Sequence, residues 1–140
     1  MRILRTLLRW SGAIALWTIV VSVLWVGLLG IVDPPVTWVM AQQAREQKEF
    51  SRMQTDLDGI SRQLPLSVIA SEDQRFMTHH GFSLEAMRKA FEKNKKAKRI
   101  KGGSTISQQT AKNVFLWPGR NYLRKGLEAW FTVLMELMWT

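Results

Sequence analysis

Residues 71–82, SEDQRFMTHHGF, bring together several side chains that could exchange protons. Glu72 and Asp73 come directly after the apolar stretch 66–70, and Arg75 and two adjacent histidines follow them. The apolar stretch, which we expect to be buried, disfavours a charged carboxylate, whereas the basic neighbours favour one. Glu72 is therefore a candidate general acid or base. The same spacing is also compatible with a structural role, in which Glu72 or Asp73 caps or pairs with groups nearby.

The histidine pair, His79 and His80, raises the question of a metal site. Adjacent histidines point in different directions, and neither an HExxH motif nor a second histidine pair accompanies them. The chain also has no cysteine, which excludes disulfides and thiolate ligands. We therefore predict a packed or hydrogen-bonding role for these histidines and no metal ligand set.

A second polar group consists of Thr105, Gln109 and Lys112. A glycine pair at 102–103 breaks the preceding segment, and the Ser-Thr pair after it can cap a helix that runs to about Phe115. Spacings of four and seven residues place the three side chains on one face of that helix. From the pattern alone, this face either meets solvent or lines a site.

A third group lies on the last predicted helix, which starts near Asn121. Arg124 and Glu128 are four residues apart and share a face, and Lys125 flanks them. The pattern predicts that the helix buries an apolar stripe, formed by Leu123, Leu127, Trp130, Phe131, Leu134 and Met138.

Between the first two groups, Ser83 is a predicted N-cap for a helix that runs to about Lys98. Residues 88–101 carry eight basic side chains against the single acid Glu92: Arg88, Lys89, Lys93, Lys95, Lys96, Lys98, Arg99 and Lys101. This run is either a solvated face or a surface for anionic lipid or phosphate.

The elements that position these groups follow an N-terminal membrane segment. Residues 10–32 are uncharged and long enough to cross a bilayer, and three arginines precede them. The alternative is a cleaved signal peptide, but no small-residue cleavage site follows Val32. The basic residues place the N-terminus in the cytoplasm and the remainder outside the membrane. Pro34 and Pro35 then end the helix.

Composition sets the remaining limits. With 140 residues, 46% of them hydrophobic, the chain is long enough for one small domain. Its net charge of +9 favours anionic lipid or phosphate as partners, and a location outside the cytoplasm argues against nucleic acid. We expect a mainly α fold, divided as cytoplasmic tail 1–9, transmembrane helix 10–32, membrane-proximal neck or connection 33–65, and domain 66–140.

The three groups occur within motifs that resemble those of the peptidoglycan glycosyltransferase family. These are E-D-x-x-F-x-x-H-x-G at 72–81, GGSTISQQTAKN at 102–113 and RKGLE at 124–128. The single anchor and the phrase STISQQTAKNVFLWPGR are similar to the monofunctional, biosynthetic members. The resemblance implies a lysozyme-like helical domain that polymerises lipid II. The growing, lipid-linked glycan is the donor, a sugar 4-hydroxyl attacks with inversion, and undecaprenyl pyrophosphate leaves.

The resemblance also implies roles for individual residues. Glu72 matches the family's catalytic base, and Glu128 matches a second functional glutamate near the leaving pyrophosphate. Asp73, Phe76 and His79 match residues of the first motif that support the base. Thr105, Gln109 and Lys112 match residues that line the substrate cleft. Lys112, Arg124 and Lys125 match cations that bind phosphate. The resemblance implies no required protein-bound cofactor, although a divalent cation, Mg²⁺ or Mn²⁺, can bridge the oxygens of the substrate pyrophosphate. Partners expected from the resemblance are lipid II, the glycan strand, the inner membrane and cell-wall synthesis proteins.

Two further family motifs are expected after the third one, beyond Thr140. We therefore expect the chain to be a fragment or a truncated product, with an incomplete domain that is periplasmic. Three alternatives to polymerisation stay open. One is an inactive piece that at most binds lipid or glycan, another is a lysozyme-like lytic enzyme, and the last is an anchored scaffold without enzymatic activity.

Overall fold

The computed structural model describes residues 2–48, 51–95, 102–119 and 121–139. In these ranges the chain is helical and contains no strand, which confirms the mainly α prediction. The α-helices are α1 (Arg2–Leu29), α2 (Trp38–Gln47), α3 (Gln63–Glu72), α4 (Leu84–Asn94), α5 (Ile106–Phe115) and α6 (Tyr122–Met138), and two short 3-10 helices are η1 (Leu57–Gly59) and η2 (Phe76–Thr78).

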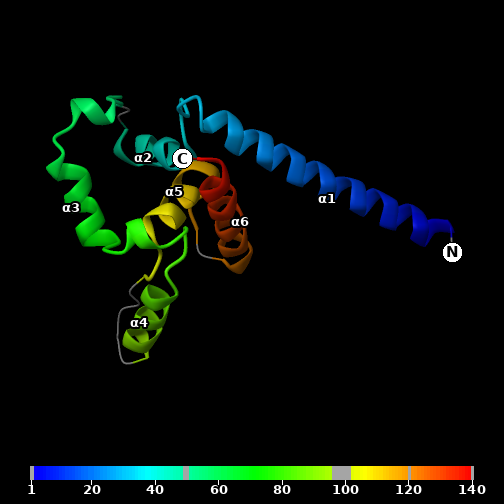
Figure 1. The fold of residues 1–140 in the computed structure, drawn as a ribbon. Helices are drawn as coiled ribbons and strands as arrows, with labels where there is room; N and C mark the ends of the chain where they lie inside the picture. The colour runs from blue at the N-terminus through cyan, green and yellow to red at the C-terminus, as the bar shows by residue number, and fades with distance from the viewer. Residues whose placement is uncertain (1, 49–50, 96–101, 120, 140) are drawn as a thin grey trace.

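Helix α1 is one long, mostly exposed rod that extends away from the other helices (Figure 1). It begins within the segment assigned to the basic tail and ends at Leu29, three residues before the predicted end of the span. Residues Ile3–Leu29 are long and apolar enough to cross a membrane. The helix ends just before Gly30, and Pro34 and Pro35 keep it from resuming.

The packed part of the molecule is formed where α5 lies on α6, α6 lies on α1 and α2 lies on α5 (Figure 1). Its core consists of Val26 from α1, Ala111 from α5, and Leu134 and Met135 from α6. Two phenylalanine rings, Phe115 and Phe131, stack beside this core with centroids 4.6 Å apart. The apolar N-terminal helix is thus part of the core.

Helix α6 buries a different stripe from the one predicted. The predicted stripe was wrong for Leu123, Trp130 and Met138, which are exposed, and correct for Leu134. Instead, α6 buries Arg124, Glu128, Thr132 and Met135, at intervals of three and four residues. This face is turned towards α5 and Gly81, and its polar groups find partners largely within α6 itself: Thr132 donates to the carbonyl of Glu128, and the Glu128 carboxylate pairs with Arg124 and Lys125.

The segment before Glu72 also differs from the prediction. Residues 63–65, predicted to be connection, already belong to α3, because Pro65 is tolerated in the first turn of a helix. The stretch 66–70 was expected to be buried, but α3 has no buried residue, and Leu66 and Val68 are exposed. The reason is that α3 stands apart from α6 and from most of α5 (Figure 1), so no described helix covers Leu66 or Val68.

Helix α4 starts as predicted. The Ser83 hydroxyl accepts from the N–H of Ala86 and caps the helix, and ion pairs join Arg88 to Glu92 and Lys89 to Glu85. Residues 96–101, which hold half of the basic run, lie outside the described part of the chain.

Candidate active site

The N-terminus of α5 is fixed by Thr105. Its hydroxyl accepts from the N–H of Gln108 at 3.2 Å and donates to the carbonyl of Gly81 at 2.7 Å. The Gln108 side chain accepts in return from the N–H of Thr105, which completes a capping box. Thr105 is only 2% exposed, so its hydroxyl serves this junction.

Gly81 allows the first motif to approach α6. Its φ of 74° lies in the left-handed region, and a Cβ atom there would come within 2.8 Å of side-chain atoms of Thr132 and Glu136. Only glycine fits both the conformation and the space. Residues 71–82 are thereby held between the start of α5 and the middle of α6.

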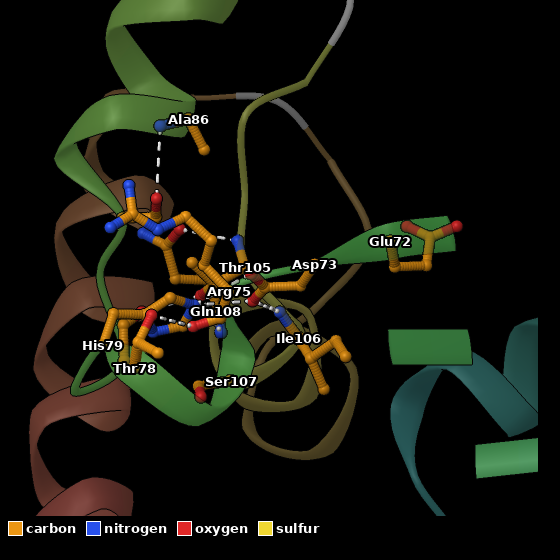
Figure 2. Close-up of polar contacts among 12 residues, drawn as sticks. Glu72, Asp73, Arg75, Thr78, His79, Ala86, Thr105, Ile106, Ser107 and Gln108 are labelled. Atoms are coloured by element: carbon orange, nitrogen blue, oxygen red, sulfur yellow. Dashed lines mark hydrogen bonds and ion pairs between the residues drawn. The ribbon is translucent and has the colours of Figure 1, made fainter. Parts of the chain in front are cut away.

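Asp73 joins the first motif to the second (Figure 2). Its carboxylate, in a residue that is 7% exposed, accepts from the N–H of Ile106 at 3.1 Å and contacts Nε2 of His79 at 2.8 Å. The positive end of the α5 dipole also stabilises a negatively charged carboxylate at this place. Asp73 therefore pairs locally with His79 and also caps a helix that begins 33 residues later.

His79 has the hydrogen-bonding position predicted for it. Its ring lies edge-on to Phe76, with centroids 6.2 Å apart, while Nδ1 is buried and has no partner among the described residues. The described part of the chain contains no group of three or more His, Asp or Glu side chains that could hold a metal ion.

Glu72 points away from this buried junction (Figure 2). It is the last residue of α3, is exposed, and its Oε2 accepts from Nε2 of Gln109 at 3.0 Å. A cavity of about 240 Å³ opens beside it, lined by Glu72, Asp73, Ala86, Lys89, Ala90, Lys93 and residues 102–105. The carboxylate is thus held by a neutral amide at the edge of a hollow that also has two lysines in its wall.

The far wall of this cavity depends on Gly103. A Cβ atom at that position would lie 2.8 Å from Cβ of Ala90 and 2.9 Å from the carbonyl oxygen of Ala86. The glycine therefore lets the loop before α5 pack directly on α4. Next to it, Ser104 accepts from Nζ of Lys125 at 3.3 Å, which links the cavity to α6.

The start of α6 holds a cluster of opposite charges. Glu128, whose side chain is 3% exposed, pairs with Arg124 at 3.4 Å through one carboxylate oxygen and with Lys125 through the other. Nε of Arg124 is buried without a partner among the described residues, and Arg124 and Lys125 line a hollow together with Asn121 and Tyr122. Both carboxylate oxygens of Glu128 are thus engaged with cations.

The structure brings five of the ten predicted site residues to one junction. Asp73, His79 and Thr105 form its buried interior, and Glu72 and Gln109 meet at its edge. Lys112 is half-buried on α5 and forms no ion pair with another described residue. Sequence reasoning missed the role of Gln108, although Thr105-x-x-Gln108 is a capping-box pattern. Lys89 and Lys93 were predicted only as members of the basic run, and their place in the wall of the cavity beside Glu72 was not foreseen.

Comparison with known proteins identifies the family. The sequence profile of the transglycosylase family matches residues 39–140, which include all three motifs. The chain belongs to this family. A biosynthetic peptidoglycan transglycosylase of Xanthomonas axonopodis pv. citri is 51% identical over 96% of the chain and 58% of that protein. The corresponding proteins of Caulobacter vibrioides and Aeromonas hydrophila are 51% and 45% identical, over 99% and 96% of the chain and 61% and 59% of their own lengths.

This transglycosylase chain spans about 60% of the length of the curated relatives that it matches. No solved structure matches it.

Proposed function

We propose that the protein is a peptidoglycan glycosyltransferase that polymerises lipid II into β-1,4-linked glycan, with Glu72 as the general base. The observation that carries this proposal is the position of Glu72, whose carboxylate is held by Gln109 at the mouth of a cavity. An exposed, oriented carboxylate can receive a proton from a hydroxyl that enters the cavity. The names of the relatives support the reaction class.

In the proposed reaction, the 4-hydroxyl of lipid II attacks the anomeric carbon of the lipid-linked glycan. Glu72 accepts the hydroxyl proton as the new C–O bond forms. The bond between the anomeric carbon and the pyrophosphate oxygen breaks, and its electron pair leaves with the pyrophosphate. Inversion at the anomeric carbon gives the β-linkage.

The leaving pyrophosphate gains negative charge, which cations must stabilise. Arg124 and Lys125 are candidates, because both cations line one hollow at the start of α6. Lys112 on α5 is the third. Glu128 then acts as a positioning residue, since both of its carboxylate oxygens already hold these cations. This refines its predicted role near the pyrophosphate.

Asp73 and His79 are positioning residues in the same sense. Asp73 directly follows Glu72 and is tied to the α5 backbone, so the base keeps its place relative to Gln109 on the same helix. We propose no resident cofactor. A Mg²⁺ or Mn²⁺ ion would arrive with the substrate pyrophosphate and would be held by its oxygens.

The membrane supplies the setting for this chemistry. We propose that α1 anchors the protein in the inner membrane, with its arginine-rich end in the cytoplasm and the site in the periplasm. Both substrates carry polyprenyl tails, so an anchored enzyme meets them in two dimensions. Cell-wall synthesis proteins are the expected protein partners.

The test is synthesis of glycan from lipid II in detergent or vesicles. It uses the 140-residue chain and a chimera in which residues 1–140 are continued by the remaining residues of the Caulobacter vibrioides relative. The chimera should release undecaprenyl pyrophosphate and form β-1,4-linked strands. Release of muropeptides from purified sacculi, without polymer from lipid II, would instead identify a lytic enzyme and contradict the proposal.

A further inference from the structure

The basic side chains of α4 lie on two different faces of the helix. Arg88 forms an ion pair with Glu92 at 3.2 Å, and neither residue lines the cavity beside Glu72. Lys89 and Lys93, which are one helical turn apart, do line that cavity. The proposed reaction assigns no role to this pair of cations, although both stand in the same cavity wall as the proposed base.

The face of α4 that meets the cavity combines small and basic side chains. Ala86 and Ala90 are half-buried and alternate with the exposed Lys89 and Lys93, so that all four share this face. Gly103 packs against the two alanines from the other side. The cavity of about 240 Å³ has the volume of roughly eight water molecules, which gives room for a group about the size of one sugar ring.

Lys89 is linked to the first motif through Glu85. Its Nζ pairs with one carboxylate oxygen of Glu85 at 2.6 Å, and the other oxygen pairs with Arg75, three residues after Glu72. This bridge connects the cavity face of α4 to the segment that carries the proposed base. Lys93 forms no ion pair with another described residue.

The two carboxylates in the cavity wall are engaged elsewhere. Asp73 accepts from the N–H of Ile106 and contacts His79, while Glu72 accepts from Gln109. Neither carboxylate forms an ion pair with a lysine of α4 in the described part of the chain. A ligand in this cavity thus meets a proton acceptor on one side and positive charge on another. Such a wall suits a sugar hydroxyl whose molecule also carries an anionic group.

We propose that Lys89 and Lys93 bind an anionic group of the acceptor lipid II, whose sugar occupies the cavity with its 4-hydroxyl at Glu72. Lipid II carries two kinds of anion, its pyrophosphate and the carboxylates of its peptide, and either accepts charge-assisted hydrogen bonds from ammonium groups. The leaving pyrophosphate of the donor is assigned to Arg124 and Lys125 on α6, so the two substrates have separate anchors. This inference rests on the proposed function, because it concerns the acceptor side of the same site.

The proposal predicts which kinetic constant changes in the chimera. With the lipid-linked glycan saturating and lipid II varied, Lys93→Gln should raise the KM for lipid II by roughly fivefold and leave kcat nearly unchanged. Lys93→Arg keeps the positive charge and should restore most of the loss. The matched control is Arg88→Gln, which removes a cation of the same helix outside the cavity and should change neither constant.

Three kinetic results would overturn the proposal. One is an unchanged KM for Lys93→Gln. Another is an equal rise of the KM for Arg88→Gln, because only the net charge of α4 would then matter. The last is a fall in kcat at constant KM, since Lys93 would then act on the charge of Glu72 and not on the acceptor.

A modified substrate distinguishes the two anions. Lipid II whose peptide carboxylates have been converted to amides keeps its pyrophosphate. If the difference in KM between the chimera and its Lys93→Gln variant disappears with this substrate, the lysines bind a peptide carboxylate. If the difference persists, they bind the pyrophosphate of the acceptor.

Equilibrium binding separates this proposal from the proposed reaction. The 140-residue chain carrying Glu72→Gln is titrated with fluorescent lipid II in detergent, with lipid-linked glycan in excess. Weaker binding after adding Lys93→Gln, but not after adding Arg88→Gln, would support the anion site even if the chimera formed no polymer. Normal polymerisation by the chimera together with equal binding by all three proteins would overturn the anion site and leave the proposed reaction standing.

Discussion

Two regions of the molecule, one packed and one open, supply the residues of the proposed site. In one, α5 and α6 bury eight residues at their contact, and α1 completes the core. In the other, α3 and α4 bury none. Glu72 belongs to the open region, whereas the cations Lys112, Arg124 and Lys125 belong to the packed one. The difference indicates that the proposed phosphate-binding side is fixed by packing, while the proposed base is held by a hydrogen bond from Gln109 at the edge of the open region.

The largest effect on stability is expected in the packed region, from Glu128→Ala. This change leaves Arg124 buried without its counter-ion, which typically costs about 3–5 kcal/mol in the free energy of unfolding. The counterpart in the open region is Glu85→Ala, which removes the exposed partner of Arg75 and Lys89 and should cost less than about 1 kcal/mol. Chemical unfolding in detergent compares the two variants. Equal losses would remove the distinction between the regions.

The Gly81→Ala variant tests the contact between residues 71–82 and α6. The left-handed backbone and the contacts with Thr132 and Glu136 should together cost roughly 1–3 kcal/mol. Gly102→Ala is the control, since a Cβ atom placed there would meet no atom within 4 Å from the described residues beyond its chain neighbours. If Gly81→Ala left the free energy of unfolding unchanged in the same experiment, residues 71–82 would not be packed tightly against α6.

A smaller effect on stability is expected from Gln109→Ala. The hydrogen bond to Glu72 is exposed, so its loss should cost less than about 1 kcal/mol. The base would lose its orientation, however, and polymerisation should fall by roughly tenfold. Gln109→Glu should slow the reaction further, because it places a second carboxylate beside Glu72. Unchanged polymerisation rates for both variants would show that Gln109 does not position the proposed base.

The sequence predicted the helices whose starts are encoded locally. Ser83, Thr105 and Asn121 all cap helices, because each supplies a side-chain oxygen within three residues of the N–H that it binds. The motif order also brought Asp73, His79 and Thr105 together as candidates. These signals are short in range, and tertiary packing did not override them.

Features that depend on distant partners were not predictable from the sequence. The bond from Asp73 to Ile106 spans 33 residues, and no periodicity reveals it. The apolar pattern of α6 indicated which face lacks polar groups, but not that the polar face meets α5 and Gly81. For α3, an apolar composition predicted burial, yet no described helix covers Leu66 or Val68.

The central claim is that the Glu72 carboxylate is the base, and its most direct test is the rate of lipid II polymerisation by the chimera carrying Glu72→Gln. Glutamine keeps the shape and a hydrogen bond to Gln109 but cannot accept the proton. We predict a fall of about 10²–10⁴-fold with lipid II binding unchanged, and no change for the exposed control Glu92→Gln. A Glu72→Gln rate within a few-fold of the unsubstituted chimera would contradict the account.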